Sequence, residues 1–301
     1  MKAGKREILV SHGSKLMFPE GNISKLAIAQ YYKSVAKFML PHLENRPLML
    51  QRFPNGIHKK GFFQKEISAH FPDWISTVTV SKEGGEVKHV LCNNEATLIY
   101  LVNQSTISFH SWLSLKNAID HPDKLIIDLD PASDDFDEVR KGAFLVKKFL
   151  EDLSITSFVM TTGSSGVHIV VPLDGQSDFD ESREAAKEIA DIQTEVHPNI
   201  FTTARYKKDR EGKIYFDIQR NAYAQTAISP YSLRPLPEGP IATPVDWTEL
   251  EDPALNARTW NINNFDQRIA EMNDPWKGMR RHAVSVRILL KRINKLVLNR
   301  A

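Results

Sequence analysis

Apolar residues recur every three or four positions over residues 25–43, beginning with Leu26, Ala29 and Tyr32. This is the spacing of one face of a helix. Ser24 comes directly before the segment, and its hydroxyl can cap a helix N-terminus. We therefore predict a helix over this segment, with the apolar face packed into a core.

Two extended segments follow, on either side of a loop rich in lysine and phenylalanine. Residues 48–53 predict a strand, and the Pro-Asn-Gly turn at 54–56 ends it. Residues 77–91 predict a hairpin around Glu-Gly-Gly at 83–85. The loop between the two carries the sequence HKKGFFQK.

From residue 124 onward, short apolar runs alternate with amphipathic segments. The predicted strands are LIIDLD from residue 125, SFVMT from residue 157, VHIVVPL from residue 167 and IYFDIQR from residue 214. The predicted helices run from Asp134 to Leu153 and from about Phe179 to Val196. This alternation indicates an α+β core that carries antiparallel strands.

The last part of the chain predicts less regular structure, followed by a helix. A proline-rich stretch from Ser229 to Pro244 is expected to run over the surface. Within the last thirty residues, Val284, Leu289, Ile293 and Val297 lie near helical spacing among many lysines and arginines. The pattern favours a docking helix with a solvated basic face over a helix that binds DNA or a membrane.

Composition narrows the class of protein only moderately. The chain has 301 residues, 42% of them hydrophobic, which suffices for one large domain or two small ones. Lys and Arg total 39 against 37 acidic residues, so the net charge of +2 carries no global nucleic-acid signature. Cys92 is the single cysteine, which excludes an internal disulfide and a thiolate metal cluster and fits a reducing cytoplasm.

No segment of the sequence has the pattern of a signal peptide or a membrane span. The N-terminus, MKAGKREILVSHGSK, lacks an apolar stretch, and no later segment approaches the roughly 18 uninterrupted apolar residues that a span needs. We expect a soluble, intracellular protein that does not associate with a membrane.

The sharpest chemical signal is LIIDLDP, which places two aspartates two positions apart on a strand. Residues i and i+2 project from the same strand face, so Asp128 and Asp130 stand side by side. Adjacent carboxylates repel, and a divalent cation such as Mg²⁺ or Mn²⁺ relieves the repulsion. The alternative is a strand end with two solvated aspartates.

A second strand, IYFDIQRN, offers a third carboxylate at Asp217. Three aspartates from two strands can support a two-metal site that activates an attacking hydroxyl and holds a leaving pyrophosphate. Arg220 and Arg234 are then candidates for phosphate contacts, because guanidinium groups pair bidentately with phosphate oxygens. Each arginine alone is more typical of an ordinary surface residue.

A Gly/Ser-rich turn, TTGSSGVHIVVP, lies between two predicted strands. Its N–H groups and the hydroxyls of Thr162 or Ser164 can cradle phosphates, and His168 projects from the strand that follows. For a lone strand histidine, a buried and hydrogen-bonded side chain is the commoner outcome. Beside the three carboxylates, however, the turn favours a nucleotide-triphosphate site.

The ordered motifs IDLDP, SSGVH, FDIQRN and SPYSLRPLPEGPIATPVDW resemble the polymerase domain of bacterial DNA ligase D, a member of the archaeo-eukaryotic primase superfamily. The earlier segments KLMFPEGNISK, ENRPLMLQRFPNGI and GFFQKEISAHFPDW are similar to that family's N-terminal landmarks. The resemblance implies a primase-polymerase fold, with an RRM-like antiparallel sheet as catalytic core and an N-terminal α/β lobe.

Because the resemblance covers essentially the whole chain, it implies one primase-polymerase domain over residues 1–301. We expect a lobe that binds DNA ends and template over about residues 1–120. The catalytic core and the C-terminal helix are expected over about residues 121–301.

The resemblance also implies roles for particular residues. The family's metal-binding triad falls on Asp128, Asp130 and Asp217, which would hold two Mn²⁺ or Mg²⁺ ions. Its nucleotide contacts fall on Thr162, His168, Arg220 and Arg234, with Ser164 in the same turn and Arg52, Lys65 and His110 at matching landmarks. Its 5′-phosphate pocket falls on Lys15 and Lys25, and its aromatic pair on Phe62 and Phe63.

Physical chemistry fits the DNA-binding roles. Lysines act as point charges for a phosphate, and an exposed aromatic ring stacks on any base. The competing interpretation of Phe62 and Phe63 is core packing, and we expect at least one of the two rings to lie in the core.

The sequence departs from the family in its Gly/Ser turn. The family commonly has Ser-Gly-Ser-Lys-Gly-x-His, whereas this chain has TGSSGVH, with Thr162 in place of a serine and Ser165 in place of the lysine. Thr162 keeps a hydroxyl. The missing lysine removes one positive charge near the triphosphate, which bears on nucleotide affinity and metal preference.

Together these features predict a template-directed nucleotidyltransferase that extends 3′ ends and fills gaps in double-strand break repair by non-homologous end joining. As in the family, ribonucleotides and Mn²⁺ are the expected preference. The expected partners are DNA gaps or ends with a 5′-phosphate, NTPs or dNTPs, Ku and an ATP-dependent DNA ligase. The expected location is the cytoplasm, in association with the nucleoid.

Three other functions fit parts of the sequence. A primase that starts primers de novo would share the fold. A non-catalytic DNA-end-binding module would use the lysines and aromatic rings, but it leaves the three aspartates unexplained. A metal-dependent phosphodiesterase would use clustered carboxylates, but not the arginines and Gly/Ser turn suited to a triphosphate.

Overall fold

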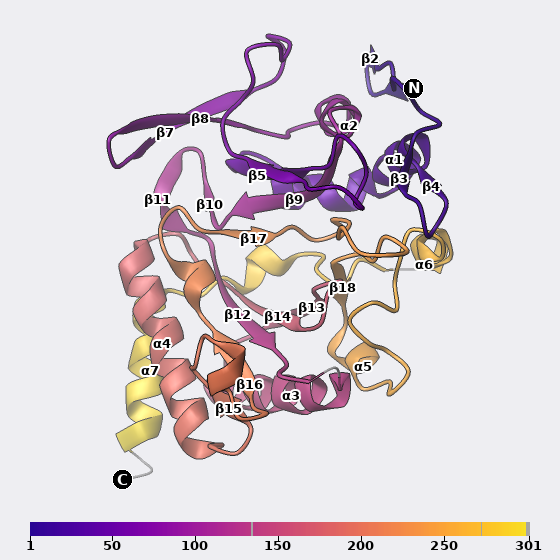
Figure 1. The fold of residues 1–301 in the computed structure, drawn as a ribbon. Helices are drawn as coiled ribbons and strands as arrows, with labels where there is room; N and C mark the ends of the chain where they lie inside the picture. Colours follow the sequence, from indigo (N-terminus) through magenta and orange to yellow (C-terminus); the bar gives the residue numbers. More distant parts are fainter. Residues whose placement is uncertain (134, 272, 299–301) are drawn as a thin grey trace. The chain divides into compact units, whose positions relative to one another are not determined.

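The computed structural model describes residues 1–133, 135–271 and 273–298, and the chain divides into two compact units. Unit 1 comprises Met1–Trp112, Thr226–Thr243 and Arg258–Asp274. Unit 2 comprises Leu113–Gln225, Pro244–Ala257 and Pro275–Ala301. Figure 1 follows the elements of each unit along the chain.

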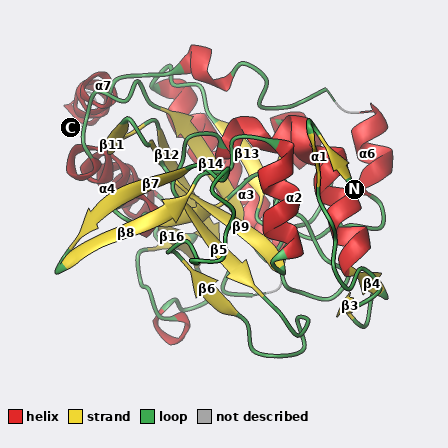
Figure 2. Cartoon of the chain, turned by 90° about the horizontal axis from the view of Figure 1, so that it is seen from above, coloured by secondary structure: helices red, strands yellow, loops and turns green. Residues whose placement is uncertain are grey.

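Unit 1 contains a four-stranded antiparallel sheet with the strand order β17-β9-β5-β6 and the helices α1 and α2 (Figure 2). Its strands are β1 (Lys2–Ala3), β2 (Arg6–Glu7), β3 (Leu16–Phe18), β4 (Ile23–Ser24), β5 (Leu48–Arg52), β6 (Phe62–Gln64), β7 (Thr77–Lys82), β8 (Gly85–Val90), β9 (Thr106–Trp112) and β17 (Thr226–Ile228). Its helices are α1 (Lys25–Leu43), α2 (Glu95–Asn103) and α6 (Phe265–Glu271).

The first predicted helix and the predicted hairpin are confirmed, but the predicted place of Leu26 on the packed face is wrong, because this side chain is 41% exposed. Helix α1 spans Lys25–Leu43, and the Ser24 hydroxyl accepts a hydrogen bond from the Ala27 amide at 3.2 Å. The hairpin pairs β7 with β8, and Gly84 at its turn has a positive φ of 76°. Glycine adopts this left-handed conformation without steric cost, which is why the sequence signal for the turn was reliable.

Unit 2 contains a six-stranded sheet with the order β15-β16-β12-β14-β13-β18. Its strands are β10 (Ser114–Leu115), β11 (Ala118–Pro122), β12 (Lys124–Asp130), β13 (Phe158–Thr161), β14 (Val167–Pro172), β15 (Phe201–Thr202), β16 (Ile214–Asp217) and β18 (Thr243–Val245). Its α-helices are α3 (Phe136–Asp152), α4 (Phe179–Val196), α5 (Trp247–Leu250) and α7 (Val286–Leu298). Three 3₁₀ turns complete it: η1 (Lys207–Asp209), η2 (Gln219–Asn221) and η3 (Met279–His282).

Strand β12 lies inside the sheet of unit 2 and is apolar on both faces. Leu125, Ile127 and Leu129 are fully buried, and Ile126 between them is 3% exposed. Helices α3 and α4 both contact this strand. It pairs antiparallel with β14 on one side and with β16 on the other. The strand is therefore fixed on all sides, which makes it a rigid support for the aspartates at its end.

Two predicted boundaries shift in the structure. The helix predicted from Asp134 begins at Phe136, with Asp135 as its N-cap, and Asp134 lies outside the described residues. The strand predicted over IYFDIQR ends at Asp217 and turns into η2. Alternation alone did not reveal that turn, because Ile218 continues the apolar pattern.

The expectation that residues 229–244 run over the surface is wrong. Tyr231, Ser232 and Leu233 are fully buried in unit 1. Buried hydroxyls satisfy the polar backbone of this irregular segment. The Tyr32 Oη accepts a hydrogen bond from the Leu233 amide at 2.9 Å, and the Ser108 Oγ donates one to the Leu233 carbonyl at 2.6 Å. Such side-chain partners allow a segment without regular structure to cross a core.

The C-terminal helix packs as the docking interpretation predicts. Val286, Leu289 and Ile293 of α7 are at most 1% exposed, and α7 contacts α4. Val284 precedes the helix and forms a bridge with Leu173. Val297 is 44% exposed, so its predicted place on the packed face is wrong. Within the described ranges, the structure shows no helix with the length and apolar character that a membrane crossing demands.

Replacing Tyr32 with phenylalanine tests the support of the buried segment. The Tyr32 Oη also donates to the Ile107 carbonyl at 2.5 Å, so Tyr32→Phe leaves one buried N–H and one buried C=O without this partner. We expect the free energy of unfolding to fall by about 2 kcal/mol, measured by thermal and urea denaturation. Tyr206→Phe, at a 64% exposed side chain, is the control. Equal stability of Tyr32→Phe and the control would contradict this account.

Candidate active site

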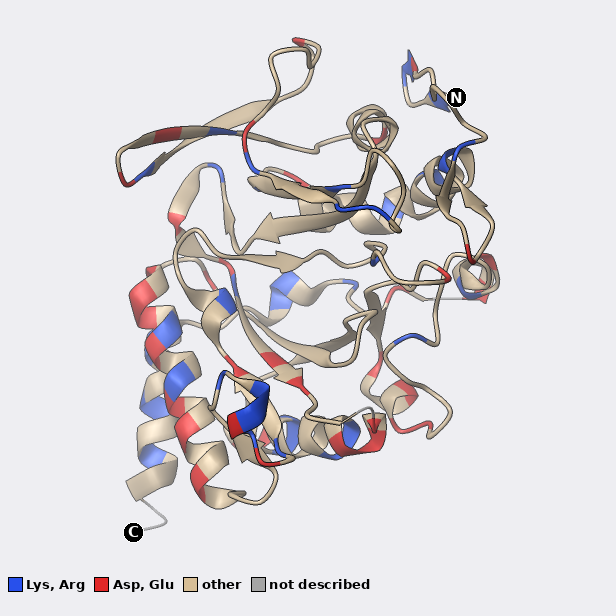
Figure 3. Ribbon diagram, in the orientation of Figure 1, with Lys and Arg blue, Asp and Glu red and all other residues tan. Residues whose placement is uncertain are grey.

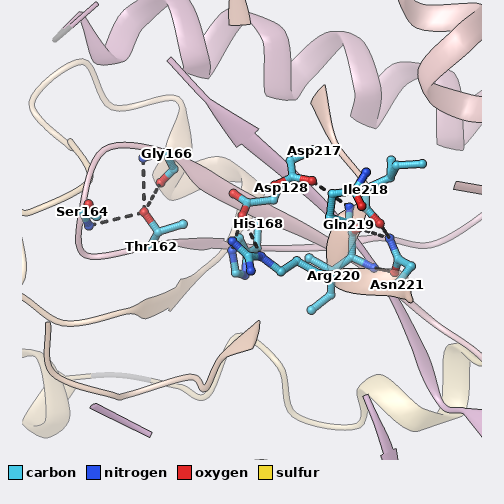
Figure 4. Close-up of polar contacts among 11 residues, drawn as sticks. Asp128, Thr162, Ser164, Gly166, His168, Asp217, Ile218, Gln219, Arg220 and Asn221 are labelled. Carbon is cyan, nitrogen blue, oxygen red and sulfur yellow. Dashed lines mark hydrogen bonds and ion pairs between the residues drawn. The ribbon is translucent and has the colours of Figure 1, made fainter. Parts of the chain in front are cut away.

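Three aspartates of unit 2 meet at the junction of β12 and β16. Asp128 and Asp217 are direct partners in the antiparallel register, and Asp130 lies two residues further along β12. One carboxylate oxygen from each residue lies within 4.8 Å of those of the other two. The structure thus brings the three predicted metal ligands together, and Figure 4 shows Asp128 and Asp217 side by side.

Asp128 is 5% exposed, and two nitrogen-bearing side chains lie beside only one of its carboxylate oxygens. Its Oδ2 lies 3.3 Å from the His168 Nε2 and 3.6 Å from the Arg220 Nε. Burial by itself raises the pKa of Asp128, but the charges and hydrogen bonds of His168 and Arg220 outweigh it, so the net shift lowers this pKa. The other oxygen, Oδ1, is buried and has no hydrogen-bond partner among the described residues. A buried carboxylate oxygen of this kind is suited to a cation.

The pKa of Asp130 shifts in the opposite direction. Burial, followed by the charge of Asp128, raises the pKa of Asp130 to about 6, although His168 and Arg210 oppose the rise. Three carboxylates within a few ångströms cannot all be charged at low cost without a counter-cation. An all-carboxylate donor set matches the preference of Mg²⁺ and Mn²⁺ for oxygen ligands. The residues therefore fit divalent cations.

Asp217 is held by the turn that follows it. Its Oδ1 accepts a hydrogen bond from the Gln219 amide at 2.7 Å, which fixes the carboxylate where β16 ends. The neighbouring Tyr215 has its pKa raised to about 12, first by burial and then by the charge of Asp217. The Arg210 guanidinium lies 4.5 Å from the centroid of the Tyr215 ring.

Asn221 is a positioning residue that the sequence analysis missed. Its side chain is buried and forms two hydrogen bonds with one residue of β12: Oδ1 accepts from the Ile126 amide at 2.8 Å, and Nδ2 donates to the Ile126 carbonyl at 2.7 Å (Figure 4). Nδ2 also donates to the Ile218 carbonyl at 3.0 Å. The amide thus continues the sheet where β16 has ended and fixes the turn that carries Arg220. The available signal was an asparagine, with both donor and acceptor, directly after a strand end.

The Gly/Ser turn joins β13 to β14 and is tied together by Thr162. The Thr162 Oγ1 donates to the Gly166 carbonyl at 3.1 Å and accepts from the amides of Ser164 and Gly166 at 3.3 and 3.2 Å. Gly163 adopts a positive φ of 67°. A Cβ on Gly166 would lie 2.1 Å from the Leu129 carbonyl oxygen, so only glycine fits beside the end of β12. The hydroxyl of Thr162 shapes the turn, and its phosphate contact stays a prediction.

In unit 1, the predicted 5′-phosphate residues belong to a cluster of like charges. Burial, followed by the charges of Lys15 and Arg52, lowers the pKa of Lys25. The Lys25 Nζ donates to the Ser11 carbonyl at 2.9 Å, and the Lys15 Nζ donates to the Pro54 carbonyl at 2.6 Å. Cations held close together by carbonyl groups rather than carboxylates favour an anion as their common partner.

The predicted aromatic pair lies on β6, and both rings are exposed. Phe62 is 46% and Phe63 55% exposed, so the expectation that one of them lies in the core is wrong. The β6 strand is an edge of its sheet and leaves both side chains partly uncovered. The Arg52 guanidinium lies 5.4 Å from the centroid of the Phe62 ring, and the His110 ring packs edge-on against Phe63 at 5.9 Å.

The predicted site residues divide between the two units. Unit 2 carries Asp128, Asp130, Thr162, Ser164, His168, Asp217 and Arg220. Unit 1 carries Lys15, Lys25, Arg52, Phe62, Phe63, Lys65, His110 and Arg234. Lys65 is exposed just beyond β6, and Arg234 is half-buried in the irregular segment after β17. Roles of the unit 1 residues at the carboxylate site stay predictions.

Fold and site together define an α+β protein with three clustered carboxylates that could hold a metal ion. Residues 24–276 match the family model described as LigD, primase-polymerase domain. The chain therefore belongs to the LigD primase-polymerase family, and this membership implies a nucleotidyltransferase. The predicted family and fold class are confirmed.

Relatives with curated names share this region. The chain is 32% identical over 265 residues to the bifunctional non-homologous end joining protein LigD of Bacillus subtilis, a match that covers 87% of this chain and 42% of that protein. It is 29% identical over 281 residues to the multifunctional non-homologous end joining protein LigD of Mycobacterium bovis, covering 90% and 37%. The chain spans about two fifths of the length of these relatives.

A solved structure supports the same assignment. The polymerase domain from Mycobacterium tuberculosis Ligase D, in complex with DNA, is similar with a TM-score of 0.86 and 27% sequence identity. The match covers 93% of this chain and 100% of that one.

The raised pKa of Asp130 predicts how pH and metal affect stability. Because this pKa of about 6 exceeds the usual value of 3.8, Asp130 stabilises the metal-free fold at low pH, and this stabilisation is lost as pH rises through 6. Cation binding requires the ionised carboxylate, so Mn²⁺ affinity should fall about tenfold per pH unit below 6. Thermal denaturation with and without Mn²⁺, at pH 5 and pH 7.5, measures both effects.

The variant Asp130→Asn removes the charge that resists burial. At pH 7.5 we expect it to raise the free energy of unfolding of the metal-free protein by about 2 kcal/mol and to abolish the stabilisation by Mn²⁺. Asp120→Asn, at an exposed position of β11, is the matched control and should change neither. An undiminished response of Asp130→Asn to Mn²⁺ would show that the cation binds elsewhere.

Proposed function

We propose that this protein is a template-directed nucleotidyltransferase that fills gaps and extends 3′ ends during non-homologous end joining, with a preference for ribonucleotides. The observation that carries the proposal is the carboxylate triad, with a ligand oxygen of each aspartate within 4.8 Å of the others, in a chain of the LigD primase-polymerase family. Its named relatives are non-homologous end joining proteins.

Asp128, Asp130 and Asp217 would hold two divalent cations, Mn²⁺ or Mg²⁺. When bound, such ions lower the pKa of the primer 3′-hydroxyl and neutralise charge on the departing pyrophosphate. The protein's own contribution is the fixed geometry of the donors. The β12–β16 register sets Asp128 against Asp217, and the Gln219 amide orients the Asp217 carboxylate. Little general acid–base chemistry is then required of the side chains.

Arg220 and His168 are suited to the nucleotide triphosphate. The Arg220 side chain is 38% exposed and lies 3.6 Å from Asp128, so it can turn toward an arriving phosphate while staying beside the carboxylates. His168 is buried, with its Nε2 directed at Asp128. The Gly/Ser turn adds backbone N–H groups, and Ser165 replaces a lysine that the family commonly has there.

Unit 1 supplies groups suited to the DNA substrate. Lys15 and Lys25 would bind the 5′-phosphate on the far side of a gap, and the exposed rings of Phe62 and Phe63 would stack on template bases. The similar polymerase domain of Mycobacterium tuberculosis Ligase D is named as a complex with DNA, which supports a DNA partner here. Ku and an ATP-dependent ligase are the proposed protein partners.

The central test offers the protein a gapped duplex with a labelled primer, a downstream 5′-phosphate, Mn²⁺, and NTPs or dNTPs in turn. We expect templated extension, favouring NTPs, that falls more than about a hundredfold in Asp128→Asn and in Asp217→Asn. Asp120→Asn should keep wild-type extension. Extension that survives in both triad variants would contradict the site assignment.

Two further measurements distinguish the polymerase from a de novo primase and from an end-binding module. Products formed on a primer-free template would indicate a de novo primase. Binding of the gapped duplex without any extension would indicate an end-binding module.

The 5′-phosphate site has its own test. The affinity of the protein is measured for gapped duplexes that carry either a 5′-phosphate or a 5′-hydroxyl downstream of the gap. We expect Lys15→Gln to weaken affinity for the phosphorylated gap about tenfold, because it removes one cation from the cluster. Affinity for the hydroxyl gap should be unchanged. Lys33→Gln, at an exposed position of α1, controls for the loss of charge, and an equal loss in both variants would contradict a specific pocket.

A further inference from the structure

The near-neutral charge of the chain conceals one strongly basic segment. Residues 277–298 contain seven lysines and arginines and no aspartate or glutamate. The remainder of the sequence holds 32 basic residues against 37 acidic ones. The match to the family model ends at residue 276, so this segment lies outside the part that the family defines.

The structure separates the segment into an apolar and a basic face. Helix α7 buries Val286 and Leu289 against its neighbours, chiefly α4. Arg287, Lys291 and Lys295 are exposed and follow each other at intervals of four residues, so they form one stripe along α7. Figure 3 colours the lysines and arginines of the ribbon blue. At 1.5 Å per residue, the stripe is about 12 Å long.

These cations have few partners within the protein. Arg287 reaches Glu181 only at 3.9 Å. Among the described residues, the side chains of Lys291 and Lys295 make no hydrogen bond or ion pair. The same holds for Arg280 and Arg281, which precede the helix in η3. We call the three residues of α7, Arg287, Lys291 and Lys295, the basic face.

On other helices of the same unit, lysines pair with acidic residues. Lys147 and Lys148 of α3 pair with acids four residues away, and Lys187 of α4 lies 3.6 Å from Asp191. A solvated helix surface commonly mixes both signs in this way. On α7 itself the exposed charges are all basic, and the ion pair of Arg287 with Glu181 of α4 leaves Lys291 and Lys295 without an acidic partner among the described residues.

We propose that the basic face binds the phosphate backbone of duplex DNA through contacts independent of base sequence. The choice of DNA as the polyanion rests on the proposed polymerase function. One DNA strand carries a phosphate about every 3.4 Å of helix axis, so a 12 Å stripe faces roughly three or four phosphates. Three cations in a row match that number.

The packing of α7 argues against a membrane as the partner. A helix that binds a bilayer surface inserts its apolar face among the lipid chains. Here Val286, Leu289 and Ile293 of that face are already buried. Only the charged side remains available, and it suits a hydrophilic polyanion.

The test uses a duplex with hairpin-closed ends, without a gap, a 5′-phosphate or a free 3′-end. Such a probe engages neither the carboxylate triad nor the 5′-phosphate cluster, so the result does not depend on polymerase activity. Fluorescence anisotropy gives the affinity over a series of salt concentrations. The triple variant Arg287→Gln, Lys291→Gln, Lys295→Gln should reduce the slope of log affinity against log salt by about three and weaken binding at least tenfold at low salt.

A matched control removes three paired lysines from the same unit. Lys147→Gln, Lys148→Gln, Lys187→Gln changes the net charge equally and should retain wild-type slope and affinity. Circular dichroism and thermal denaturation establish that both variants fold. Wild-type binding by the basic-face variant, or an equal loss in the control, would overturn the proposal. So would wild-type binding to phosphatidylserine vesicles without binding to the duplex.

The same preparations are assayed for gap filling, which keeps the two proposals distinct. Salt-dependent duplex binding that requires the basic face, without nucleotide addition by the wild type, rejects the polymerase function and retains the DNA contact. Gap filling by the wild type, with unaltered duplex binding in the basic-face variant, rejects the DNA contact alone.

Discussion

Mutual repulsion among three carboxylates, of which Asp128 and Asp217 are buried, is the constraint on which the carboxylate site of unit 2 depends. The antiparallel register sets Asp128 directly against Asp217, and the two-residue period of β12 adds Asp130 on the same side. A shift of one residue would turn these side chains to the other face. The continuous apolar run of β12, buried between two partner strands and two helices, opposes such a shift. Core packing therefore holds together charges that would otherwise separate.

The surroundings neutralise this charge only in part. Asp128 has His168 and Arg220 beside it and a lowered pKa, whereas Asp130 has a pKa raised to about 6. Full compensation by side chains would leave no reason for a cation to bind. Among the described residues, the Oδ1 of Asp128 has no hydrogen-bond partner, so this oxygen is available to a cation. Asn221 supports the arrangement without adding charge, because its amide bonds to the backbone of Ile126 and fixes the turn that bears Arg220.

Much of the fold and of the site followed from local sequence rules, and the exceptions have physical causes. The placement of Asp128 beside Asp130 follows from the strand period, and the strand IYFDIQRN offered Asp217 as a third carboxylate, which the family resemblance then assigned to the metal-binding triad. The role of Asn221 depends on where β16 ends, which apolar alternation through Ile218 concealed. The proline-rich composition of residues 229–244 wrongly predicted a surface segment. Their burial depends on hydroxyls such as that of Tyr32, about two hundred positions away. The exposure of Phe63 follows from an edge strand that only the sheet order reveals.

The two cationic surfaces differ in their physics, and this difference separates their roles. Lys25 is buried beside Lys15 and Arg52, so its charge is costly and its pKa is lowered. A desolvated lysine of this kind gains most from one localised anion, such as a terminal phosphate, and salt screens its interactions weakly. The three cations of the basic face are exposed, so salt screens their interactions strongly. The first surface is suited to recognising a feature of DNA, and the second to holding DNA whatever its sequence.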